Sequence, residues 1–138
     1  MRLEVTRKSD LAVRALRSLA DHGGRVKGPV LAETVGSTSG FVSQVLHPLV
    51  RQGWVRSDPG PAGGYSLAVD LTSVSVLAVI EAVEGPTESG RCVLADRPCN
   101  ESGTCALHVP WLRARAQLLG ELAATSVAEA SMVTEGAR

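Results

Sequence analysis

Aromatic side chains and long apolar runs are both scarce in this chain of 138 residues, and each scarcity excludes a class of structure. Phe, Trp and Tyr make up 3% of the residues, so the core has to be built from Leu, Val and Ala. That composition favours helices over a β-sandwich. The longest apolar run, at 74–80, is far shorter than the roughly 20 residues that cross a bilayer. With 44% hydrophobic and 20% charged residues, the chain is predicted to be a folded soluble domain.

Signals for secretion and for catalysis are also missing from the sequence. The opening residues MRLEVTRKSD contain no apolar stretch of the kind found in signal peptides. We therefore expect a cytoplasmic protein, in which thiols stay reduced and clustered cysteines bind metal more often than they form disulfides. The sequence holds no HExxH motif, no phosphate-cradling glycine loop and no evident pairing of a nucleophile with a base. An enzymatic function is not expected.

The net charge of zero conceals a division along the chain. Residues 1–57 hold nine Lys and Arg against four acids, and residues 58–138 hold five basic residues against ten acids. A basic first half is typical of a surface that binds an anion such as DNA. The acidic second half indicates a different task.

The first half of the chain predicts three helices, because apolar residues recur there at helical spacing. They are expected over 9–22, over 29–35 and between Ser37 and Gly53, with Ser37 as the N-cap of the third helix and Gly53 as its C-cap. The tight turn at Gly36 joins the second helix to the third. This arrangement is typical of a helix-turn-helix, whose second helix enters the DNA major groove.

The residues after the helix-turn-helix predict a β-hairpin and two further helices. Short β-capable runs at 54–57 and 64–69 are joined by the Gly- and Pro-rich segment DPGPAGG, which suits a ribbon tip. A β-hairpin directly after a helix-turn-helix is called a wing. A helix over 73–84 follows, and Pro110 is expected to begin a last long helix. Its broad apolar stripe indicates packing against a partner helix.

The predicted fold is therefore mainly α with a small β-wing, a winged helix-turn-helix followed by a long C-terminal dimerisation helix. Its expected parts are a DNA-binding domain over 1–85, a loop over 86–109, and the dimerisation helix with its tail over 110–138. A loop as long as the one predicted here usually carries a function.

The residues expected to contact DNA are polar and small side chains of the third helix and the hairpin. They can reach phosphates or base edges, with further phosphate contacts from the basic N-terminal arm. The candidates are Thr38, Ser39, Ser43, Gln44, Arg51, Arg56, Gly63 and Gly64. Three features depart from the usual pattern. The third helix has no cation before Arg51, it contains Pro48, and the hairpin tip has no cation. A winged helix used only for protein contacts is the alternative.

The three cysteines all lie in the loop, with spacing Cys92-x6-Cys99-x5-Cys105, and His108 follows them. Zinc sites usually open with two ligands separated by two to four residues, which only Cys105 and His108 approach. Widely spaced thiolates can instead surround the larger core of an iron–sulfur cluster. The spacing alone leaves an iron–sulfur cluster, a zinc ion and redox thiols open.

The order of these pieces resembles the IscR/NsrR family of bacterial iron–sulfur transcriptional repressors. The matching pieces are MRL, SDLAVRAL, LAETVGSTSGFVSQVLHPLVRQGWV, GPAGGYSL, VSVLAVIEAVEG and the three-cysteine loop before a long helix. The resemblance implies a homodimer whose last helices cross, double-stranded operator DNA as partner, and Cys92, Cys99 and Cys105 as cluster ligands.

The resemblance leaves the fourth ligand open between Asp10 and His108. IscR-type members bind a [2Fe-2S] cluster with a histidine at the place of His108. Some NsrR-type members bind a [4Fe-4S] cluster with an aspartate from the partner's first helix, at the place of Asp10. Each residue also has a structural explanation, Asp10 through the helix dipole and His108 through a hydrogen bond to the loop. We slightly favour Asp10 and [4Fe-4S], because SDLAVRAL is closest to the NsrR-type members.

The sequence and the resemblance together predict a dimeric DNA-binding repressor whose cluster senses nitric oxide, redox stress or iron–sulfur status. The alternative is a zinc-stabilised winged-helix regulator without a redox cluster. In that alternative Cys92, Cys99, Cys105 and His108 form a Cys3His site.

Overall fold

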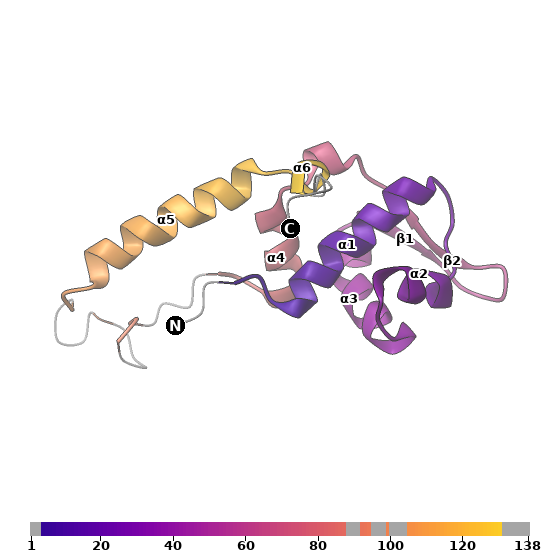
Figure 1. Ribbon diagram of the computed structural model, residues 1–138, viewed down its shortest axis with the longest axis horizontal. Helices are drawn as coiled ribbons and strands as arrows, with labels where there is room; N and C mark the ends of the chain where they lie inside the picture. Colours follow the sequence, from indigo (N-terminus) through magenta and orange to yellow (C-terminus); the bar gives the residue numbers. More distant parts are fainter. Residues whose placement is uncertain (1–3, 88–91, 95–98, 100–104, 131–138) are drawn as a thin grey trace.

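A computed structural model describes residues 4–87, 92–94, 99 and 105–130 of the chain. Its elements are α1 (Arg7–His22), α2 (Gly28–Val35), α3 (Ser39–Arg51), β1 (Val55–Asp58), β2 (Gly64–Leu67), the 3-10 turn η1 (Leu71–Ser73), α4 (Val76–Glu84), α5 (His108–Ala124) and α6 (Val127–Ala130). Helices α1 to α4 and the hairpin form one body, from which α5 extends to one side (Figure 1). The predicted fold, mainly α with a small β-wing, is confirmed. The opening MRL and the predicted tail after residue 130 lie outside the described residues.

The core lies where α1, α3 and α4 pack against one another, and it is aliphatic. Its largest fully buried side chains include Leu11, Leu16, Leu19, Leu31, Leu46, Leu49, Val45 and Val79. Burying one such side chain contributes about 1.5–3 kcal/mol to the free energy of unfolding. The buried hydroxyl of Ser9 donates a hydrogen bond to the carboxylate of Glu84, which joins the start of α1 to the end of α4.

The helix starts differ from the sequence prediction, because neighbouring hydroxyl residues compete for the N-cap. Thr6 caps α1 by accepting from the Ser9 N–H at 3.2 Å, so the helix begins two residues earlier than predicted. The cap of α3 is Thr38, whose hydroxyl accepts from the Phe41 N–H at 3.2 Å. The prediction of Ser37 was wrong. Its backbone N–H closes the preceding turn by donating to the Ala32 carbonyl at 2.9 Å.

The end of α3 also corrects one detail of the prediction. The C-cap is Gln52, and Gly53 follows it with a left-handed φ of 80°. Helix α3 continues through Pro48 to Arg51.

The wing is an antiparallel pair of strands with Val55 opposite Leu67 and Asp58 opposite Gly64. Each strand is four residues long, so β1 begins one residue later than predicted and β2 ends two residues earlier. A short bridge between Val26 and Tyr65, closed by two backbone hydrogen bonds of 2.8 Å, ties the segment before α2 to the wing.

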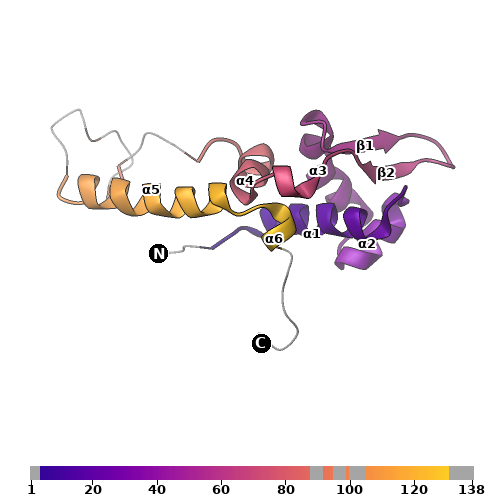
Figure 2. The same ribbon diagram turned by 90° about the horizontal axis from the view of Figure 1, so that it is seen from above.

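Helix α5 is attached to the body mainly through its C-terminal end. Beyond it, the Val76 N–H donates to the Thr125 carbonyl and the Val127 N–H donates to the Val74 carbonyl, both at 2.8 Å. The Val127 side chain is fully buried in the core. The N-terminal end of α5 lies far from the wing (Figures 1 and 2). Within the described parts of the chain, no helix combines the length and apolar character needed to span a bilayer.

Candidate metal centre and nucleic-acid interface

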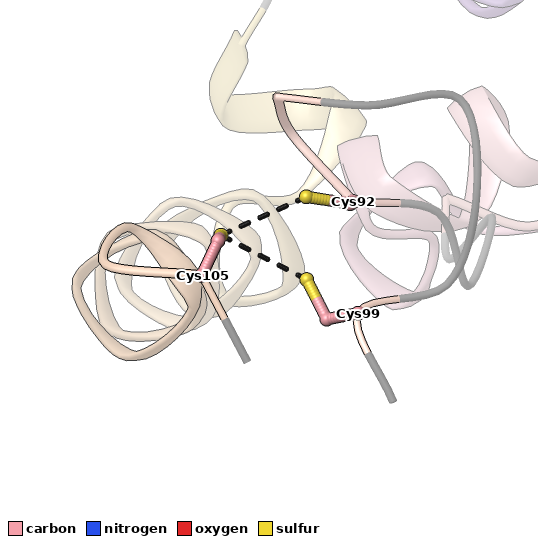
Figure 3. A group of neighbouring side chains, drawn as sticks. All are labelled: Cys92, Cys99 and Cys105. Atoms are coloured by element: carbon pink, nitrogen blue, oxygen red, sulfur yellow. Dashed lines mark hydrogen bonds between the residues drawn. The ribbon is translucent and has the colours of Figure 1, made fainter. Parts of the chain in front are cut away.

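The three cysteine side chains converge at the N-terminal end of α5. The Cys92 thiol donates to the sulfur of Cys105 at 3.6 Å, and the Cys99 thiol donates to the same sulfur at 3.8 Å (Figure 3). The three sulfur atoms all lie within 4.8 Å of one another, and each side chain is half-buried. The three cysteines are not joined by disulfide bonds. They form the group we call the thiol triad.

Local backbone hydrogen bonds position two of the three thiols. The Cys105 carbonyl accepts from the His108 N–H at 3.1 Å, so Cys105 begins the turn that leads into α5. The Leu94 N–H donates to the Cys92 sulfur at 3.4 Å. Because α5 begins at His108, two residues before Pro110, the predicted start of the last helix was wrong.

Proximity changes the ionisation of the Cys99 thiol. The backbone of Cys105 lowers the pKa of this thiol by hydrogen bonding, whereas the Cys92 thiol, partial desolvation and the Cys105 thiol all raise it. The net effect raises the pKa of Cys99 above its ordinary value. A bound cation acts in the opposite direction, because metal coordination favours the thiolate.

The thiol triad fits a thiophilic metal by both its chemistry and its spacing. Thiolates are the ligands that zinc and iron–sulfur clusters share. Zn–S bonds of about 2.3 Å place sulfur atoms about 3.8 Å apart at the corners of a tetrahedron. The thiol–sulfur distances of 3.6 and 3.8 Å match that single-ion geometry. A cluster has a larger core, so its binding would separate the thiols further.

The two candidate fourth ligands lie outside the thiol triad in this chain. Among the described residues, the group of potential metal ligands within 4.8 Å of one another consists of the three cysteines. His108 is the first residue of α5 and is half-buried. Asp10 lies in the first turn of α1, is 54% exposed, and accepts from Arg14 Nε at 3.0 Å. It borders an open hollow of about 480 Å³ that is lined by α1, the end of α2 and the last residue of α6.

The predicted DNA contacts of α3 lie on the exposed side of that helix. Thr38, Ser39, Ser43, Gln44 and Arg51 are all exposed, whereas Val42, Val45, Leu46 and Leu49 are buried against the core. His47 is exposed as well and continues the line through Ser43 and Gln44. The sequence prediction missed it, although its spacing from both residues indicates the same helix face.

A cation approaches the start of α3 from another helix. The guanidinium carbon of Arg7 lies 5.8 Å from the centre of the Phe41 ring, which is within the range of a cation–π contact. Positive charge is therefore present beside the first turn of α3, where the helix itself has no Lys or Arg.

The predicted wing residues divide into one exposed cation and two structural glycines. Arg56 is exposed on β1. A Cβ at Gly63 would lie 1.9 Å from the Asp58 carbonyl oxygen, and one at Gly64 would lie 2.5 Å from the Val26 carbonyl oxygen. Gly64 also has a φ of 148°. Both positions require glycine for the backbone to close the wing.

Helix α5 presents apolar side chains that its own chain leaves exposed. None of its residues, His108–Ala124, is buried. Its large exposed apolar side chains are Val109, Trp111, Leu112 and Leu118. A helix with this surface in water is typical of one that packs against another molecule.

Comparison with known sequences identifies the family. The family model Rrf2, described as an iron-dependent transcriptional regulator, matches residues 5–132. This chain belongs to the Rrf2 family. The HTH-type transcriptional regulator IscR of Sodalis glossinidius is 34% identical over 113 residues, covering 79% of this chain and 67% of the relative. The IscR of Serratia proteamaculans is 30% identical over 131 residues, covering 92% of this chain and 78% of the relative.

Solved structures with the same fold include a CymR and an IscR. Staphylococcus aureus CymR matches with a TM-score of 0.73 and 24% identity, covering 94% of this chain and 99% of CymR. The structure of T. potens IscR matches with a TM-score of 0.72 and 23% identity, covering 96% and 93%. At these identities the structures confirm the fold.

Membership of the Rrf2 family confirms two predictions made from the sequence. The chain is a transcriptional regulator of the IscR-like type rather than an enzyme, and the family supports DNA binding. The thiol triad is compatible with an iron–sulfur cluster.

Proposed function

We propose that this chain is a homodimeric repressor whose affinity for operator DNA is controlled by an iron–sulfur cluster bound at the thiol triad. The convergence of Cys92, Cys99 and Cys105 within 4.8 Å carries the proposal. The description of the family as iron-dependent supports iron over other thiophilic metals. A cytoplasmic location, where thiols stay reduced and DNA is present, belongs to the same proposal.

The place of the thiol triad connects sensing to DNA binding. The triad joins the segment after α4 to the start of α5, and α4 packs against α1 and α3. An iron–sulfur cluster, when bound, supplies redox chemistry and a target for nitric oxide or oxidants. Loss of the ligand contacts would free Cys92 from Cys105, and the positions of α4 and α5 would no longer be coupled through the loop. Operator release requires that the two states differ in DNA affinity by a few kcal/mol.

Asp10 of the partner subunit is our proposed fourth ligand, with a [4Fe-4S] cluster slightly favoured over [2Fe-2S]. The position of Asp10 supports this assignment, because its carboxylate is 54% exposed beside an open hollow and so is accessible to another chain. His108 is the alternative ligand within the chain.

The homodimer is supported by the exposed apolar face of α5. Trp111, Leu112 and Leu118 are between 36% and 48% exposed in the single chain. A second copy of α5 crossing the first would cover them. We therefore assign dimerisation to the part of the chain from residue 110 and the metal site to residues 86–109.

DNA binding is assigned to the part before residue 86, through the exposed side of α3 and the wing. Thr38, Ser39, Ser43 and Gln44 would face the major groove, and Arg51 and Arg56 would contact phosphates. Gly63 and Gly64 would act by shaping the wing rather than through side chains.

The test is anaerobic purification followed by analysis of iron, acid-labile sulfide and zinc. The proposal predicts iron and sulfide in comparable amounts and little zinc. It also predicts that Cys99→Ala loses both while remaining a folded dimer. A Cys99→Ala protein that retained iron and sulfide would contradict the ligand assignment.

A second candidate is a zinc-stabilised regulator without a cluster. It is favoured by the distances of 3.6 and 3.8 Å within the triad, which suit one tetrahedral ion. Zinc near one ion per chain, with no acid-labile sulfide after anaerobic purification, would establish this candidate and overturn the cluster.

A further inference from the structure

The wing carries no net charge of its own. Among residues 55–67, Arg56 is the basic residue and Asp58 is the acidic one. The Asp58 carboxylate lies within 3.3 Å of Arg56 Nε, so the two charges offset each other. A wing that approaches the DNA backbone needs positive charge, because phosphate neutralisation dominates nucleic-acid affinity.

A cation reaches the wing from a distant part of the sequence. Arg25, in the segment between α1 and α2, donates from Nη1 to the Ala62 carbonyl at 2.8 Å. Its Nε lies 3.4 Å from Asp58 Oδ2. The guanidinium therefore spans the wing from the end of β1 to the tip, and the Arg25 side chain remains 51% exposed.

The backbone bridge to the wing determines this orientation. Val26 is buried and pairs with Tyr65, so the residues on either side of it point away from the core. Lys27 lines, with Asp58 and Gly60, a hollow of about 360 Å³ between the wing and the start of α2. The bridge thus places two positively charged residues, Arg25 and Lys27, beside a wing whose own charges sum to zero.

We propose that Arg25 is a DNA-backbone contact that completes the wing. Its guanidinium offsets the charge of Asp58 and holds the tip through the Ala62 carbonyl. A guanidinium group has five N–H donors, so those of Arg25 that are exposed remain available to a phosphate. This inference rests on the proposed DNA-binding function and adds a contact outside both α3 and the hairpin.

The test is the salt dependence of binding to a mixed-sequence DNA duplex, measured with the full-length protein by fluorescence anisotropy. Loss of one phosphate contact lowers the slope of log K against log salt by about 0.9. Arg25→Ala is therefore expected to reduce the slope by that amount and to weaken binding uniformly across sequences. Arg25→Lys should retain the slope of the wild type. Asp58→Asn should strengthen binding, because it removes the acidic charge from the wing.

Arg17→Ala is the matched control, because it also removes one arginine that pairs with an aspartate. Arg17 lies 4.0 Å from Asp21 within α1, and the proposal gives it no phosphate contact, so its loss should leave the slope unchanged. Wild-type protein without salt-dependent binding would overturn the DNA-binding function itself. If the wild type binds and Arg25→Ala keeps its slope, the phosphate contact is overturned, even where affinity falls through a loosened wing.

Discussion

The sulfur atoms of Cys92 and Cys105 lie 3.6 Å apart although thirteen positions separate them in the sequence. The Cys99 sulfur lies 3.8 Å from the same Cys105 sulfur. Because Cys105 leads directly into α5, any ligand held by the three thiols also fixes the start of that helix. This relationship couples the proposed metal site to the start of α5, the proposed dimer helix.

Mixed dimers of Asp10→Ala and Cys99→Ala chains test whether the fourth ligand comes from the partner. In the mixed dimer, the intact thiol triad belongs to the Asp10→Ala chain and the intact Asp10 belongs to the other chain. If Asp10 ligates across the dimer, co-expressed and separately tagged chains should recover about half of the wild-type iron and sulfide.

The two homodimers are the controls for that experiment, and each should be depleted of the cluster. If the Asp10→Ala homodimer retained wild-type amounts of iron and sulfide, Asp10 would not be a cluster ligand. A parallel loss in His108→Ala would then assign the ligand to His108, with Mössbauer spectra reporting the cluster type.

Leu118→Glu is expected to convert the proposed dimer into a monomer. Leu118 is 48% exposed in the single chain, so the change leaves the monomer fold intact but places a charge in the proposed helix pair. Losing the burial of one leucine costs about 1.5–3 kcal/mol per copy, which corresponds to at least a tenfold increase in the dimer dissociation constant. Sedimentation velocity measures the shift. Gln117→Glu adds the same charge at the neighbouring position and should leave the dimer unchanged.

Thr38→Ala is expected to lower the free energy of unfolding by about 1 kcal/mol, because it removes the side-chain cap of α3. Ser37→Ala is the matched control, since the Ser37 hydroxyl is not the cap of this helix. Urea unfolding of both variants reports the difference. Equal midpoints for the two variants would contradict the assigned cap.

Gly63→Ala is expected to distort the wing, because the added Cβ would lie 1.9 Å from the Asp58 carbonyl oxygen. The variant should lose stability and DNA affinity together, as measured by urea unfolding and anisotropy. Gly40→Ala provides the comparison. A Cβ at Gly40 meets no atom within 4 Å, and alanine within α3 should stabilise the helix by roughly 0.5–1 kcal/mol.

Helix positions were largely predictable because their signals are local. The spacing of Leu11, Leu16 and Leu19 places these side chains on one side of a helix, and this is the side of α1 that the core buries. The hydroxyl that caps each helix was less predictable. Ser37 and Thr38 are equivalent by residue type, and only the backbone geometry at the turn decides which oxygen reaches a free N–H.

Local sequence patterns were enough to predict the winged helix-turn-helix, the concentration of all three cysteines in one loop, and the apolar character of the last helix. Each of these depends on residue types at short separations, which constrain local backbone conformation and the periodicity of burial. Three features became visible only in the folded chain: the three sulfur atoms lie within 4.8 Å of one another, Arg25 contacts a wing more than thirty residues away, and α5 leaves its apolar side chains exposed. Contacts of that kind depend on how the elements pack, because packing brings together side chains whose positions in the sequence carry no common signal.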